Sequence, residues 1–127
     1  MENPIHFENI RKVWFDVRLS LLSLKAKCPN LRWNIEDVYA ECVNGTALLW
    51  HEDGRFVIFK SYVDELTLAK VLWVWVACGK GLLEQQARLD DFAREEGYDE
   101  IRLTSPRLGW TGIEGWQFMD ATYSRKL

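Results

Sequence analysis

The residues best placed to bind an anion lie together in the second half of the sequence. A hydrophobic segment, Val71 to Ala77, leads into Cys78-Gly79-Lys80-Gly81, and a helical pattern follows. Free backbone N–H groups at the start of a helix bind anions, glycine allows a backbone to approach its ligand closely, and Lys80 would add a positive charge. An ordinary strand-to-helix turn uses the same residue types. The pattern therefore leaves an anion-binding loop and a simple turn both open.

The cysteines and histidines do not form a metal site. Cys28, Cys42 and Cys78 are widely spaced and contain no Cys-x-x-Cys, and His6 and His51 do not complete a familiar zinc-binding spacing. Cys78 has no neighbouring histidine or arginine to lower its pKa. We therefore expect no bound metal and three reduced, mostly buried thiols, as in a reducing cytoplasm.

Charge and hydropathy exclude several kinds of partner. The 127 residues include 16 Lys plus Arg and 19 Asp plus Glu, so the net charge is −3, and the basic residues are scattered among acidic ones. Nucleic-acid binding normally needs a basic stripe, so we expect no nucleic-acid partner. The longest apolar run, Val71 to Cys78, is far shorter than the roughly 20 residues that span a membrane, and no secretory signal precedes it. We expect a protein without membrane association.

The first element is a helix over Phe7 to Cys28. Ile10, Val13, Trp14, Val17, Leu21, Leu24 and Cys28 follow offsets of three and four residues and share one face. Pro29 ends the helix, because proline restricts the residue before it. A second apolar set, Phe15, Leu19 and Leu22, predicts that this helix is buried on two sides.

The remaining pattern predicts one layered domain over residues 1–127, with residues 1–30 forming an N-terminal helix packed on it. Its elements are a short helix capped by Asn34 and ended by Gly45; strands Thr46 to Trp50 and Arg55 to Tyr62, joined by the turn His51-Glu52-Asp53-Gly54; a strand Lys70 to Ala77; a helix Leu82 to Glu96 ended by Gly97; a strand Asp99 to Thr104; a loop Ser105 to Gly115; and a strand Trp116 to Arg125. The order is α-α-β-β-β-α-β-β, an α/β (α+β) fold with a mixed central sheet flanked by helices.

The strand Lys70 to Ala77 is apolar on both faces. Trp73 and Trp75 alternate on one face, and Leu72, Val74 and Val76 take the other. A strand of this kind is typical of the centre of a sheet that is covered on both sides. The two tryptophans are therefore either core residues or an aromatic wall for an acyl or pantetheine group.

The segment Val71 to Gly97 resembles the coenzyme-A-binding core of the GNAT N-acetyltransferase superfamily. In that core, a strand leads to a Gln/Arg-x-x-Gly-x-Gly/Ala loop and a helix. The resemblance implies a GNAT-like fold that binds acetyl-coenzyme A or coenzyme A, through Val76, Ala77, Cys78, Gly79, Lys80 and Gly81. Val76 stands at the Gln/Arg position, and Leu82 follows Gly81 directly, so the loop is shorter than the family pattern.

The chain from Val38 onward is most similar to small GNAT-like proteins of tailed bacteriophages or prophages. The shared pattern comprises Glu36-Asp37-Val38, Gly45, Leu49-Trp50, Gly79, Gly97 and the Arg-x-Gly-Trp element at Arg107-Leu108-Gly109-Trp110. The resemblance implies a substrate or interaction loop that contains Arg107, Trp110 and Trp116. It also implies a phage or host protein as partner, in the host cytoplasm or the virion.

The residues that would perform acyl transfer do not match the family. Thr111 stands where active members often place a tyrosine general acid, and Val71 to Ala77 contains no Glu or His to serve as a base. Two functions follow from the resemblance: a catalytically degenerate binding or virion-assembly component, or a coenzyme-A-dependent N-acetyltransferase acting on an amine of a protein or small molecule. An unrelated α/β binding module is a third possibility.

Overall fold

The computed structural model describes residues 5–29, 31–78, 85–104 and 125. Its elements are, in chain order, α1 (Ile10–Lys27), α2 (Ile35–Asn44), β1 (Leu48–Glu52), β2 (Arg55–Val63), β3 (Lys70–Cys78), α3 (Gln86–Glu95) and β4 (Glu100–Leu103). The first seven predicted elements are confirmed in type and order. The eighth, the predicted strand at 116–125, lies outside the described residues except for its last position.

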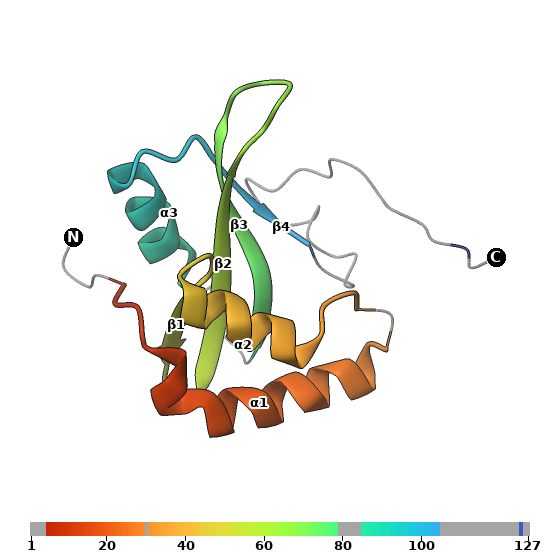
Figure 1. Ribbon diagram of the computed structural model, residues 1–127. Helices are drawn as coiled ribbons and strands as arrows, with labels where there is room; N and C mark the ends of the chain where they lie inside the picture. Colours follow the sequence, from red (N-terminus) through yellow and green to blue (C-terminus); the bar gives the residue numbers. More distant parts are fainter. Residues whose placement is uncertain (1–4, 30, 79–84, 105–124, 126–127) are drawn as a thin grey trace.

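The four strands form one mixed sheet in the order β1-β2-β3-β4. β1, β2 and β3 are antiparallel neighbours, whereas β3 and β4 are parallel and connected through α3. Helices α1 and α2 lie on one face of the sheet, and α3 lies on the other (Figure 1). This arrangement confirms the predicted single layered α/β domain.

Turns and helix ends lie at the residues predicted for them, but the Asn34 side chain does not cap α2: it donates to Asp37 at 3.3 Å and accepts no backbone N–H. Gly45 ends α2 with φ 79° and ψ 7°, and its N–H donates to the Cys42 carbonyl at 3.3 Å. Asp53 and Gly54, between β1 and β2, both have positive φ (53° and 74°), as a tight hairpin turn of this type requires. These positions depend on local backbone geometry, which is why their residue types predict them.

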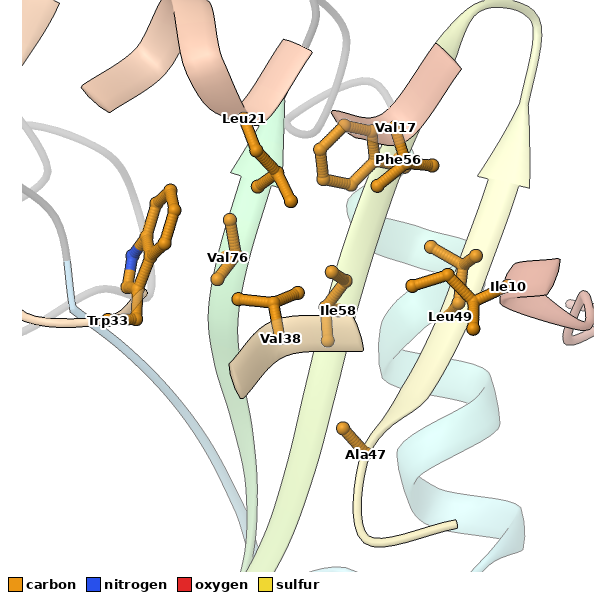
Figure 2. Packing of buried hydrophobic residues seen from close by; sticks show 10 residues of the cluster. All are labelled: Ile10, Val17, Leu21, Trp33, Val38, Ala47, Leu49, Phe56, Ile58 and Val76. Atoms are coloured by element: carbon orange, nitrogen blue, oxygen red, sulfur yellow. The ribbon is translucent and has the colours of Figure 1, made fainter. Parts of the chain in front are cut away.

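Each face of the sheet carries its own hydrophobic core. Figure 2 shows the core under α1 and α2, formed by Ile10, Val17, Leu21, Trp33, Val38, Ala47, Leu49, Phe56, Ile58 and Val76. The core under α3 is formed by Ile5, Trp50, Val57, Phe59, Leu72, Val74, Leu89, Phe92 and Ala93. β2 and β3 contribute to both cores, which is consistent with their central positions.

The expected two-sided burial of α1 is wrong. Phe15, Leu19 and Leu22 are 76%, 50% and 40% exposed, respectively, whereas Val17 and Leu21 on the opposite side are fully buried. The helix lies on the outside of the domain, so only one of its two apolar sides meets the sheet (Figure 1). None of the helices among the described residues combines the length and hydropathy needed to cross a bilayer.

The expected face of Val76 is also wrong, because β3 contains a bulge. Ile58 pairs with Val76 and Phe59 with Val74, so Trp75 is an extra residue opposite β2. As a result, Leu72 and Val74 pack under α3, whereas Val76 packs under α1 and α2. The extra residue shifts the alternation of the following side chains between the two faces of the sheet by one position.

Candidate functional site

Within the part of the chain that the structure describes, β3 extends beyond β4 at their carboxyl ends. Their pairing runs from Val71–Glu100 to Val74–Leu103, the last residue of β4, and β3 then continues to Cys78 paired with β2. In Figure 1, β3 continues beyond the end of β4. In open α/β sheets, ligands bind in the crevice outside the carboxyl ends of the strands. The carboxyl ends of β3 and β4 are therefore the candidate site.

The bulge at Trp75 lies directly after the described pairing of β3 with β4. It follows Val74, which is the last residue of β3 that pairs with β4 among the described residues. A bulge bends its strand and increases the local twist, and bulges are frequent beside binding sites. The bulge therefore lies beside the candidate site.

Three predicted coenzyme-binding residues lie at the end of β3, and their side chains take part in packing. Val76 is 3% exposed among the residues under α1 and α2. The Cys78 thiol donates to the Ser20 carbonyl of α1 at 3.7 Å. Ala77 packs on the opposite face, under α3. Because these side chains pack in the two cores, a ligand at the strand edge would contact the backbone of this segment.

The other predicted site residues cannot be placed in the fold. Gly79, Lys80 and Gly81 lie outside the described residues, as do Arg107, Trp110 and Trp116. Their assignment to a coenzyme loop and an interaction loop stays a prediction. The helix predicted from Leu82 is described from Gln86 onward, with Gln85 as its N-cap.

An ion pair fastens the start of α3 to β1. Arg88, in the first turn of α3, donates to Glu52 at 2.9 Å and to the Gln85 side chain at 2.9 Å. Its guanidinium lies over the Trp50 ring, 5.1 Å from the centroid, and the Trp50 indole N–H donates to Glu52 at 2.8 Å. These hydrogen bonds from Arg88 and Trp50 lower the pKa of Glu52 below its ordinary value. Glu52 is thus part of a hydrogen-bonded network with Arg88 and Trp50.

The sequence analysis did not single out Arg88. An arginine in the first turn of a helix is unfavourable beside the positive end of the helix dipole, and that position was the available signal of a specific partner. Glu52, which the sequence analysis places only in the turn His51-Glu52-Asp53-Gly54, has a carboxylate that accepts from both Arg88 and Trp50. Among the described residues, no group of three His, Cys, Asp or Glu side chains could hold a metal ion.

Trp73 and Trp75 lie on the same side of β3, as predicted. The Lys60 ammonium lies 5.8 Å from the ring centroid of Trp73 and 4.6 Å from that of Trp75, and it forms a 2.7 Å ion pair with Glu41 of α2. Both rings are half-buried. This aromatic pair adjoins the bulge, and Trp75 also packs against the core under α1 and α2.

The opposite end of the β3–β4 pair is held by Arg102. Its guanidinium contacts Asp64 at 2.8 Å and Glu100 at 2.7 Å, and it donates to the Tyr62 hydroxyl at 3.1 Å. The hydrogen bond from Arg102, with two backbone N–H donors, lowers the pKa of Asp64 to about 2, and the same contacts raise the pKa of Arg102. Both groups therefore stay charged at neutral pH.

The pKa values that are clearly shifted among the described residues do not provide a proton-transfer group near neutral pH. Burial raises the pKa of the Cys42 thiol to about 11, and the pKa values of Glu52 and Asp64 move downward. A general acid or base works best with a pKa near the operating pH. No clearly shifted group among the described residues is therefore tuned to act as an acid or base near neutral pH.

The comparison with solved structures finds several proteins described as acetyltransferases. The ribosomal-protein-alanine N-acetyltransferase from Brucella melitensis biovar Abortus 2308 matches with a TM-score of 0.66 and 19% identity, over 96% of this chain and 97% of that one. A probable acetyltransferase matches with a TM-score of 0.65 and 10% identity over 98% and 97% of the two chains. A putative acetyl transferase from Pyrococcus furiosus matches with a TM-score of 0.56 and 15% identity over 87% and 92%.

These similarities establish the fold. Neither the scan of protein-family models nor the search of curated proteins finds a match to the sequence. The solved structures nevertheless cover almost the whole chain at low identity. The protein has the GNAT acetyltransferase fold, as its sequence resemblance implied.

Proposed function

We propose that this protein binds acetyl-coenzyme A at the carboxyl ends of β3 and β4 and transfers the acetyl group to an amine. The observation that carries the proposal is that, among the described residues, β3–β4 pairing ends at Val74, four residues before β3 itself ends at Cys78. The β3 backbone beyond Val74 would bind the pantetheine arm by hydrogen bonds. Gly79, Lys80 and Gly81 would then meet the pyrophosphate, by virtue of their place in the chain.

The chemistry needs little from the protein beyond positioning. The neutral amine attacks the thioester carbonyl, the new C–N bond forms, the C–S bond breaks, and coenzyme A leaves as a thiolate. The thiolate or water takes the proton that the amine loses. Orientation of two reactants and stabilisation of the developing oxyanion by a strand N–H lower the barrier without a tuned side chain. This mode of action is consistent with the lack of Glu and His in Val71 to Ala77.

A second function is favoured by that same lack and by Thr111. In this alternative, the protein keeps the GNAT fold and acts as a binding or assembly component of a phage or prophage, without acyl transfer. The partner would be a phage or host protein, in the host cytoplasm or the virion. The similarity to phage proteins over Val38 to the C-terminus supports this alternative.

Calorimetry and thermal unfolding with acetyl-coenzyme A test the binding proposal. A ligand at 100 times its Kd stabilises a fold by about 2.7 kcal/mol, so binding raises the Tm measurably. Gly79→Asp and Lys80→Glu are expected to abolish the shift, whereas Lys27→Glu, a matched charge reversal at the far end of α1, leaves it unchanged. No shift at millimolar ligand would overturn the proposal.

An acetyl-transfer assay separates the two functions. Release of the free coenzyme A thiol that depends on an added amine, above the rate of the Gly79→Asp variant, supports transfer. Binding without turnover over a panel of protein N-termini, lysine peptides and small amines supports the binding role. In that case, association with purified phage structural proteins is the expected finding, and its absence would contradict the assembly role.

Deletion of Trp75 tests the bulge itself. The deletion places Val76 directly after Val74, so the register with β2 becomes regular and Val76 and Ala77 keep their present faces. We expect the fold to persist, β3 to run straighter beside β4, and acetyl-coenzyme A affinity to fall about tenfold or more. Unchanged affinity in a folded deletion variant would show that the bulge does not shape the site.

A further inference from the structure

The outer side of α1 carries an apolar stripe that the rest of the described chain leaves uncovered. Phe15, Leu19 and Leu22 are 76%, 50% and 40% exposed. Their spacings of four and three residues place them in one line along the helix, and Lys12 and Ala26 extend this line with the same spacing. Alternation of three and four residues is the spacing of a seam between two packed helices.

The helix that carries this stripe is firmly attached to the domain. Ile10, Val17 and Leu21 on its inner side are at most 2% exposed and pack against the sheet and α2 (Figure 2). Its start is capped by Asn9, whose side chain accepts from the Arg11 N–H at 3.0 Å. A partner that binds the outer stripe would therefore meet a preformed helix, with little ordering cost.

The charges beside the stripe are mainly positive. α1 contains five basic residues and one acidic residue, in a chain whose net charge is −3. Arg11 and Arg18 each precede a residue of the line, and neither takes part in an ion pair within the part of the chain that the structure describes. Lys25 follows Arg18 at the same interval at which Arg18 follows Arg11. Its ammonium donates instead to the Leu31 and Trp33 carbonyls.

These charges argue against a second copy of α1 as the occupant. In an antiparallel pair, equivalent flanking positions face one another, so Arg11 and Arg18 would meet arginine and lysine. In a parallel pair, Arg11 would meet Asp16 of the other copy, but Arg18 would meet the uncharged Ser23 and Lys12 would face itself within the seam. Acidic side chains on the partner would instead meet Arg11 and Arg18 with opposite charge, which favours both encounter and correct register.

The geometry points to the Phe15–Leu19–Leu22 stripe as a docking surface for an amphipathic helix of another protein that carries acidic residues beside its own apolar seam. The helix-in-groove mode of recognition uses this combination of apolar anchors and flanking charges. The inference does not depend on coenzyme binding, because Phe15, Leu19 and Leu22 lie on the side of α1 opposite Val17 and Leu21, which pack against the sheet.

A pair of designed helical peptides tests the inference in solution. Both have leucine at the seam positions of about three heptads, and they differ only in carrying Glu or Lys at the flanking positions. Fluorescence anisotropy of the labelled peptides with the full protein gives the two Kd values. We expect the acidic peptide to bind about tenfold or more tightly than the basic one, with the difference shrinking at high salt.

Variants of the stripe make the test specific. Phe15→Ser and Leu19→Ser should each weaken the acidic peptide about tenfold, and the double change Arg11→Glu with Arg18→Glu should reverse the preference toward the basic peptide. Leu66→Ser, at a side chain 95% exposed between β2 and β3, is the matched control and should change nothing. All these side chains are exposed, so circular dichroism and Tm should show an intact fold.

Other occupants give different results, and each would overturn the inference. Equal binding of both peptides, or binding unaffected by Phe15→Ser, would show that the peptides do not recognise the stripe or its flanking charges. Sedimentation of the protein alone as a dimer that Phe15→Ser dissociates would assign the stripe to a second copy. Co-sedimentation with phosphatidylserine vesicles that Phe15→Ser abolishes, without peptide discrimination, would assign it to a lipid surface.

Discussion

The two ends of the β3–β4 pair are built differently. At the amino end, the Asp99 N–H donates to the Lys70 carbonyl and the Lys70 N–H donates to the Asp99 carboxylate, both at 2.8 Å. Arg102 adds its ion pairs with Asp64 and Glu100. At the carboxyl end, pairing with β4 stops at Val74 and β3 continues beside β2.

The difference separates a strand pair held by side-chain bonds from a strand end that extends beyond its described partner. The bonds at the amino end hold the two strands in register. The bulge at Trp75 lies directly after the described β3–β4 pairing, in the part of β3 that leads toward α3. Substitutions that weaken one end of the β3–β4 pair and leave the other unchanged test whether the two ends are independent.

The largest expected effect comes from the core beneath the point where the described β3–β4 pairing ends. Phe59 is fully buried, pairs with Val74 and contacts the rings of Phe7 and Trp50. Phe59→Ala leaves a cavity and should lower the free energy of unfolding by about 3–5 kcal/mol, measured by urea denaturation. Phe15→Ala, at a side chain 76% exposed, is the matched control and should stay within about 0.5 kcal/mol of the parent. Equal losses would contradict the described packing.

Asp99→Ala should loosen only the amino end. The change removes the carboxylate that accepts from the Lys70 N–H and should cost about 1 kcal/mol. Hydrogen exchange should accelerate at the amides of Val71 and Leu72 and stay constant at Val76 to Cys78. Asp91→Ala, which removes an acidic charge from the exposed side of α3, should leave both regions unchanged. Faster exchange at Val76 to Cys78 would mean that the two ends are not independent.

The Arg102 ion pairs should give the amino end a pH dependence. The pKa of Asp64 is about 2 in the folded protein, below the ordinary value of 3.8, so its ionised form stabilises the fold. This contribution is fully present above about pH 5 and is lost as the pH falls toward 2. Asp64→Asn should lower the Tm at pH 7, and its difference from the parent should shrink as the pH falls toward 2.

Glu65→Gln is the control for this titration, because it removes the neighbouring acidic charge, which takes part in none of the ion pairs among the described residues. It should keep the pH profile of the parent. A profile of Asp64→Asn that runs parallel to the parent from pH 7 to pH 2 would exclude the Asp64–Arg102 pair as the source of the dependence.

The smallest effect on stability is expected at the carboxyl end. Glu52→Gln weakens the pair that holds the start of α3 to β1, and the pair is partly exposed, so the loss should be at most about 1 kcal/mol at pH 7. Faster hydrogen exchange at the first backbone amides of α3 would show that the loss of stability is local to the start of this helix. A loss of acetyl-coenzyme A binding free energy larger than the loss of unfolding free energy would indicate that this ion pair contributes to the site. Equal losses would show a purely structural role.

Local patterns account for most of the fold. The helix stop at Gly45 and the hairpin turn at Asp53-Gly54 depend on backbone conformations that few residues adopt, so residue types alone predict them. The inner face of α1 follows the helical period. For the candidate site, the sequence located the end of β3 through its apolar run and the glycines after Cys78, and the GNAT fold through its resemblance.

Three features required the tertiary structure. The ion pair between Glu52 and Arg88 joins residues 36 positions apart, which no local pattern contains. The bulge at Trp75 depends on which residues of β2 lie opposite, so strict alternation misplaced Val76. The exposure of Phe15 depends on where α1 lies relative to the sheet.

The sequence by itself determined which segments become helices and strands, where they turn, and which of them have apolar sides. Periodicity and turn chemistry act within a few residues, so they are readable along the chain. Only the tertiary structure decided which apolar side of α1 is covered, which face Val76 takes, and which residues of β3 pair with β4. Each of these depends on contacts between distant segments, and their packing and pairing become definite only in the assembled fold.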